Sequence, residues 1–190
     1  MYDGGVLIAA DSRTTSGNLI ANNTSDKLEP LHQRIYAQRC GVSAHTRAVC
    51  RYTRYYLDAH TAELQDLPLV ETAAKVVQGI FYKNQGALSG SMLVSGWDRL
   101  KGPQIYDVAK GNCIESKIAY HGSGSVFMAG YLDKNFREGM SKAEAYDLLK
   151  EAISLATYRD GGSGGNIRMV DITEEGIKRE YIEYSERDYR

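Results

Sequence analysis

The stretch DGGVLIAADSRTT (residues 3–15) decides the fold. It opens with an Asp-Gly pair, a strong hairpin signal, because the turns that match strand twist need positive φ at their central positions. The apolar run over residues 6–10 ends at a charged Asp-Ser-Arg, as is typical of a strand buried on both faces. A hairpin needs two strands, and only two residues precede the turn. Either the turn prediction is wrong, or a strand that should precede Asp3 is absent from the given sequence.

Length and composition predict a single domain over residues 1–190 with a sizeable core. The net charge is -1, which gives no electrostatic reason to expect nucleic acid or a membrane as a partner. Three cysteines without C-x-x-C spacing indicate reduced thiols in the cytosol or nucleus. The four histidines are scattered, so we expect no metal site and no cofactor.

Strand and helix signals are segregated along the chain. Apolar and β-branched patterns predict strands over residues 6–10, 18–22, 34–40, 91–96, 104–108, 117–120, 166–172 and 180–184. Helical spacing predicts helices over residues 43–64 and 70–84 and a third that opens at the capping box of Ser141, followed by strands and a solvated tail over residues 183–190. Because helices do not alternate with strands, the order favours an α+β layered fold over a doubly wound one.

Each expected helix carries an apolar stripe. On the first, the recurring positions are Ala48, Tyr52, Tyr55, Tyr56 and Ala59. On the second they are Val70, Ala73, Ala74, Val77 and Phe81, and on the third Ala145, Leu148, Leu149, Ala152 and Leu155. We expect these stripes to face the core.

The glycine-rich loop at residues 161–165 formally fits G-x-S-x-G, the nucleophile elbow of α/β-hydrolases. All four histidines precede it, although the triad histidine should follow the serine. The loop also follows a helix instead of a strand. A serine hydrolase that uses Ser163 is therefore kept only as a third alternative, testable with a fluorophosphonate probe.

Several short motifs occur together in a fixed order. They are ADSRTT (10–15), SDKL (25–28), the turn at residues 39–41, GSGS (122–125) and RDGGSGG (159–165). In this combination the chain resembles the β subunits of the proteasome core particle over essentially its whole length, including GNIRMVDIT (165–173). Within that family it is most similar to the caspase-like catalytic type, through IAADSRTTSGNLIAN, RCG and YLDKNFREGMSK.

The resemblance implies an N-terminal-nucleophile hydrolase fold, a four-layer αββα sandwich of two antiparallel sheets between helix layers. It also implies a subunit that assembles with other proteasome α and β subunits in stacked seven-membered rings. Such particles degrade unfolded polypeptides in the ATP-dependent, ubiquitin-linked route, in the cytoplasm and nucleus.

The implied activity is that of a threonine-type endopeptidase, in which a threonine at the mature N-terminus attacks the peptide carbonyl and its own amine serves as base. The matching positions carry the family's roles. Lys27 is the buried cation that tunes local pKa values, and Asp11 is its carboxylate partner. The amine would be surrounded by Ser123, Asp160 and Ser163, and the N–H of Gly41 would stabilise the oxyanion.

The same resemblance implies a pocket for acidic residues before the cut. Arg39 matches the basic position that sets this preference, and Arg47 lies close in sequence; a guanidinium suits a carboxylate bidentately. Thr15, Ser25 and Ser43 complete the expected substrate-binding set. His45 stands where the family usually has an acidic residue.

The written sequence lacks the nucleophile that this mechanism needs, because an internal threonine such as Thr14, Thr15 or Thr24 has no free amine. Two readings stay open. Either the sequence is a piece of a longer chain with its threonine upstream, which makes it a protease, or it is a non-catalytic subunit that completes the ring.

Overall fold

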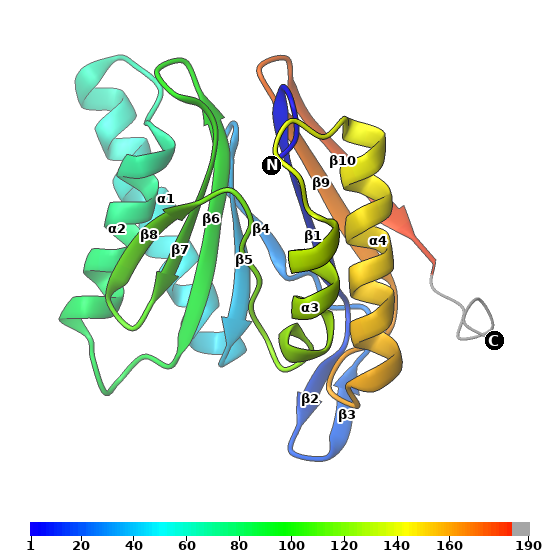
Figure 1. Cartoon of the computed structure of the whole chain (residues 1–190). Helices are drawn as coiled ribbons and strands as arrows, with labels where there is room; N and C mark the ends of the chain where they lie inside the picture. The colour runs from blue at the N-terminus through cyan, green and yellow to red at the C-terminus, as the bar shows by residue number, and fades with distance from the viewer. Residues whose placement is uncertain (184–190) are drawn as a thin grey trace.

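The computed structural model describes residues 1–183; most of the expected tail and the end of the last expected strand lie outside the described residues. Figure 1 shows four layers. Helices α1 (Ser43–Leu64) and α2 (Val70–Lys83) form one outer layer, two sheets form the middle, and α3 (Ser125–Asn135) and α4 (Lys142–Arg159) form the other outer layer. The expected α+β sandwich of two antiparallel sheets between helix layers is confirmed.

The two stacked sheets are antiparallel throughout and differ in size. The smaller has the order β1-β9-β10, with bounds Gly5–Asp11, Ile167–Thr173 and Gly176–Ile182. The larger has the order β4-β5-β6-β7-β8, with bounds Leu28–His32, Ile35–Gly41, Gly90–Asp98, Gly102–Ala109 and Asn112–Ser116. A separate hairpin joins β2 (Thr14–Ser16) to β3 (Leu19–Asn22) and projects from one end of the sandwich (Figure 1).

Strand β1 is buried on both faces, as its continuous apolar run predicts. Val6, Ile8 and Ala10 pack between the two sheets. Leu7 and Ala9 point the other way, into the core beneath α3 and α4. Because side chains alternate along a strand, β1 contributes to two of the three cores that hold the layers together.

The turn before β1 is the predicted tight hairpin. Tyr2 and Gly5 exchange backbone hydrogen bonds of 3.1 and 3.3 Å, and Gly4 has a φ of 97°, in the region that glycine adopts at no steric cost. Within the described residues this bridge is the only pairing on that edge of β1, because β9 occupies the other edge. The chain therefore presents β1 with one edge almost entirely unpaired.

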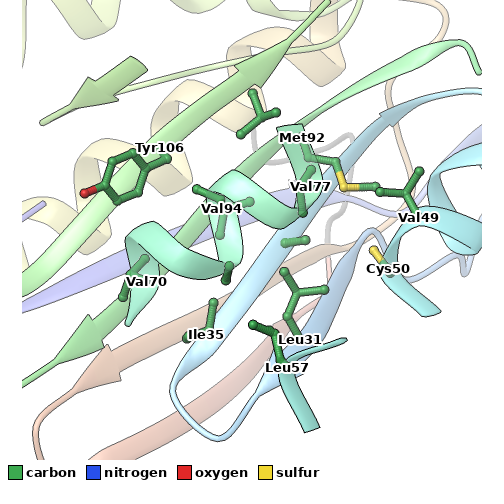
Figure 2. Close-up of a cluster of buried hydrophobic side chains, with 14 of the residues drawn as sticks. Leu31, Ile35, Val49, Cys50, Leu57, Val70, Val77, Met92, Val94 and Tyr106 are labelled. Atoms are coloured by element: carbon green, nitrogen blue, oxygen red, sulfur yellow. The ribbon is translucent and has the colours of Figure 1, made fainter. Parts of the chain in front are cut away.

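Helices α1 and α2 cover the larger sheet through a core that Figure 2 shows. The predicted stripe of α2 is confirmed, since all five of its residues are buried. The predicted stripe of α1 is wrong: Tyr52, Tyr55 and Tyr56 are exposed, and the buried residues are Thr46, Val49, Cys50, Thr53 and Leu57. Tyrosine carries a polar tip that tolerates solvent, so counting it as apolar hid the real stripe.

Residues 117–120 do not form the predicted strand. Lys110 and Gly111 have φ values of 50° and 82°, which place a tight turn directly after β7 and start the next strand, β8, at Asn112. The chain leaves the sheet after Ser116, and Ile118 and Tyr120 pack against the core under α3 and α4 instead. Three further elements, β2, β4 and α3, carry weak local signals and were not expected as such.

Helix α4 begins as the sequence predicts. The Ser141 hydroxyl accepts a hydrogen bond from the N–H of Glu144, and the Glu144 carboxylate accepts one from the N–H of Ser141. This reciprocal capping box fixes the first turn of the helix. Of the predicted stripe, Ala145, Leu148 and Ala152 are buried.

The core between α1 and the larger sheet gives a direct test of the layer assignment. Leu57→Ala should lower the free energy of unfolding by about 2–5 kcal/mol, because it leaves a cavity at a fully buried position. Leu64→Ala on the same helix is the matched control, since Leu64 is 58% exposed and its loss should cost under about 0.5 kcal/mol. Urea unfolding of the two variants measures both values, and equal losses would contradict the assignment.

Candidate active site

A cavity of about 350 Å³ opens where segments from distant parts of the sequence meet. The C-terminal ends of β1 and β5 line it, together with the start of α1, the loop before α3 and the glycine-rich loop after α4. Loops that are held by rigid elements are the usual location of binding and catalytic residues. This cavity is therefore the candidate site.

A lysine-aspartate pair lies on one wall. Lys27 Nζ is 2.5 Å from Asp11 Oδ1, with side-chain exposures of 26% and 14%. The other carboxylate oxygen of Asp11 accepts hydrogen bonds from the N–H groups of Arg13 (3.1 Å) and Gly164 (3.0 Å). Because the pair is partly withdrawn from water, its charges interact more strongly with groups inside the cavity than surface charges would.

Asp160 holds two serine hydroxyls at the next wall. Ser123 and Ser163 donate to its Oδ2 at 2.6 and 2.7 Å, and the N–H of Gly162 donates to Oδ1 at 3.0 Å. Burial acts to raise the pKa of Asp160, but these hydrogen bonds and the charge of Lys27 outweigh it and lower the pKa below its ordinary value. Both hydroxyls thus donate hydrogen bonds to a carboxylate, and their oxygen lone pairs remain available to accept hydrogen bonds from an amine.

The glycine-rich loop is set by a close approach of Arg13. A Cβ built on Gly164 would lie 2.2 Å from the Arg13 guanidinium carbon, so a side chain there would require the Arg13 side chain to move. Arg13 also donates to the carbonyl of Gly161 at 3.3 Å. The hydroxyl of Ser163 donates to Asp160 and not to a histidine, which removes the support for a serine hydrolase elbow.

Gly41 lies at the end of β5 on the cavity wall. Its φ is 102°, and a Cβ at this position would lie 2.6 Å from the Cα of Gly90 on the neighbouring strand. Only glycine meets both conditions. The backbone therefore reaches the cavity here without a side chain in front of it.

The two arginines of the predicted substrate pocket differ in how they are engaged, and a third arginine of the cavity, Arg13, lies against the glycine-rich loop. Arg39 is buried, with its Nε 3.3 Å from a Glu29 carboxylate oxygen and its Nη2 donating to the carbonyl of Asp26. Arg47 is exposed on the first turns of α1 and forms no ion pair with a described residue. Of the two predicted substrate-binding arginines, Arg47 is therefore the one whose charge is free for a ligand, while Arg39 is already paired.

The structure brings the predicted site residues together. Ten of the eleven line the one cavity: Thr15, Asp11, Ser25, Lys27, Arg39, Gly41, Ser43, Arg47, Ser123 and Ser163. The eleventh, Asp160, contacts Ser123 and Ser163 directly. Ser25 is itself fixed by a 2.7 Å hydrogen bond from the hydroxyl of Thr14.

Sequence reasoning did not assign several further residues of the wall, and the titratable ones among them are Arg13, Cys40 and His121. Each lies next to or within a motif that was identified, so adjacency to the motif was the available signal. His45, by contrast, is not part of the wall, because its Nδ1 accepts a hydrogen bond of 3.1 Å from the N–H of Ser89.

Two kinds of feature are absent from the part of the chain that the structure describes. No group of three or more His, Cys, Asp or Glu side chains there is arranged to hold a metal ion. None of the described helices has the length and apolar character needed to cross a membrane.

Comparison with known proteins identifies the family. The proteasome subunit family model matches residues 1–172. The chain is 43% identical over 182 residues to proteasome subunit beta type-6 of Dictyostelium discoideum, covering 95% of this chain and 85% of that protein. It is 42% identical over 181 residues to human proteasome subunit beta type-9, with coverages of 95% and 83%.

A third relative is the probable proteasome subunit beta type-1 of Schizosaccharomyces pombe, which is 41% identical over 182 residues, with coverages of 95% and 80%. All three relatives are β-type subunits and span nearly the whole chain. Together with the two-sheet sandwich and the cavity at its end, these matches show that the chain belongs to the proteasome subunit family and is of the β type.

Proposed function

We propose that this chain is a catalytic β subunit of the proteasome core particle, a threonine-type endopeptidase of the caspase-like kind that cuts after acidic residues. The observation that carries the proposal is the convergence of the Asp11–Lys27 pair and the Asp160 cluster with its two serines on one cavity. A subunit kept only for ring assembly needs no amine-binding serines beside a lysine.

The unpaired edge of β1 accounts for where the nucleophile would lie. Tyr2 pairs with Gly5. In an antiparallel ladder, moving one residue toward the N-terminus on one strand moves the pairing one residue toward the C-terminus on the other. Asp11 follows Gly5 by six residues, so a residue about six positions before Tyr2 would reach Asp11 and Lys27. We infer that a threonine on a segment upstream of Asp3 takes this place.

The geometry then supports the following reaction. The amine of the threonine accepts the proton of its own hydroxyl, and the oxygen attacks the carbonyl carbon of the scissile peptide bond. Ser123 and Ser163 hold the amine through their free lone pairs, and the Lys27 charge favours the deprotonated form of the oxygen nearby. The N–H of Gly41 stabilises the negative oxygen that forms on the substrate.

The amine then delivers its proton to the leaving nitrogen, and the peptide bond breaks to leave an ester on the threonine. A water molecule gives one proton to the same amine and attacks the ester, which releases the acid product and restores the hydroxyl. Each proton taken is thus returned, and no cofactor or metal takes part.

Arg47 supports the acidic preference. Its side chain lines the cavity and forms no ion pair with the residues that the structure describes, so it can receive the carboxylate of the residue before the cut. Arg39 lies behind, neutralised in part by Glu29. Thr15, Ser25 and Ser43 supply the remaining polar contacts.

A non-catalytic ring subunit is the second candidate. It is favoured by the hydrogen bonds that Asp11 accepts from backbone N–H groups, one of them in the glycine-rich loop. These bonds hold the loop against β1 and would stabilise the fold even in a subunit that catalyses no reaction. In either case we propose that the partners are other proteasome α and β subunits in stacked seven-membered rings. We propose that these particles lie in the cytoplasm and nucleus and that their substrate is unfolded polypeptide.

Lys27→Met tests the two candidates. In assembled particles, cleavage after acidic residues should fall by at least about 100-fold, because the charge that assists proton transfer is lost. Lys142→Met removes a comparable pair with Asp171 away from the cavity and should leave this cleavage unchanged. Hydrolysis of fluorogenic peptides that end in Asp measures both; an unaffected rate in the Lys27→Met particle would support the ring-subunit role.

Arg47→Gln tests the substrate assignment. The kcat/KM for peptides with Asp before the cut should fall roughly 10- to 100-fold relative to peptides with Leu there, because a hydrogen bond to a charged group is lost. Arg51→Gln is the control on the same helix, since Arg51 packs over Tyr52. An unchanged ratio of kcat/KM between the two peptides would mean that Arg47 does not bind the side chain before the cut.

A further inference from the structure

A second cavity, of about 490 Å³, adjoins the candidate site. Cys40, Gly41 and His121 line both cavities, so the two meet at the end of β5. The second cavity then continues past the start of β6 to the turn between β7 and β8. The cleft is therefore longer than the site of reaction alone requires.

The second cavity has a positive electrostatic character. Among the described residues, Lys110 is the one fully charged residue that lines it, and no acidic side chain does. Lys110 forms no ion pair with a described residue, and its backbone is fixed in the tight turn with Gly111. Around it, Gln85 and Ser89 offer hydrogen-bonding groups, and Phe81 and Leu88 offer an apolar surface.

The wall between the cavities is held by a hydrogen-bonded chain. His121 Nε2 lies 2.7 Å from Asp107 Oδ1, and His121 Nδ1 lies 3.1 Å from Ser91 Oγ. In the tautomer with the proton on Nε2, the ring donates to Asp107 and its Nδ1 accepts from Ser91. Asp107 is thus held against the His121 ring, and it forms no ion pair with Lys110.

The position of Gly41 determines in which direction a bound peptide runs along the cleft. In the proposed reaction the scissile carbonyl lies at Gly41, and the side chain before the cut extends toward Arg47 in the first cavity. The chain after the cut must leave on the other side of Gly41, where the second cavity begins. An extended peptide therefore delivers its first residues after the cut to Lys110.

We propose that the second cavity binds the residues directly after the scissile bond and that Lys110 selects an acidic side chain there. This inference rests on the proposed function of the chain as a protease. Glutamate is the best match, because its methylene groups can lie on Phe81 and Leu88 while its carboxylate reaches the ammonium group. The preferred cutting site is then acidic on both sides of the bond.

The test uses assembled particles and internally quenched peptides that carry Asp before the cut and either Glu or Lys directly after it. Cuts are assigned to this chain by their loss in the Lys27→Met particle. In Lys110→Met particles the Glu-to-Lys ratio of kcat/KM should fall about three- to tenfold, as expected for a partly exposed ion pair. Lys110→Glu should invert the preference.

Lys150→Met serves as the matched control, because Lys150 is exposed on α4 and lines neither cavity. An unchanged ratio in both Lys110 variants, with cleavage after Asp preserved, would overturn the inference and leave the proposed function standing. A shift in preference for residues before the cut would overturn the direction assigned to the cleft. If no particle cuts after Asp, the proposed function fails and the inference fails with it.

Discussion

The carboxylate of Asp11 is the contact on which the rest of the site depends. One oxygen accepts from Lys27, and the other accepts from the N–H groups of Arg13 and Gly164. A single side chain at the end of β1 thus joins this strand end to two other segments, those of Lys27 and Gly164. Because an unpaired buried charge is costly, the loop after α4 and the segment that carries Lys27 are both held at this position. The cavity takes its shape from that junction.

Charge is distributed across the cavity in a way that separates two tasks. Lys27, Asp11 and Asp160 lie together, where hydrogen bonds hold each group in position and leave serine lone pairs that can accept from an amine. Arg47 and Lys110 lie to either side, and neither forms an ion pair with a described residue. The net charge of the whole chain, -1, conceals this local positive character. Electrostatic selection of a substrate is therefore a property of the cleft and not of the composition.

The architecture explains why the open edge of β1 matters. A strand buried on both faces is held firmly by the cores, yet the unpaired N–H and C=O groups along its open edge can hydrogen-bond to another strand. Here that edge runs from the Tyr2–Gly5 bridge to Asp11, so the same strand that forms two cores also points to the reacting position. Packing and catalysis would thus share one element, which ties the proposed activity to the stability of the sandwich.

The sequence by itself determined the α+β class, the position of β1, the α2 stripe and the capping box of α4, because each is a local pattern of period, turn or cap. With the family resemblance it also identified the eleven residues that meet at the cavity. It misplaced the α1 stripe and the strand after residue 111, since tyrosine burial and a Lys-Gly turn depend on neighbours. Only the tertiary structure decided that Arg39 forms an ion pair with Glu29 while Arg47 forms none with a described residue, and that Lys110 lies beside the cleft. Pairing and direction are set by contacts between segments far apart in the chain, which no local pattern encodes.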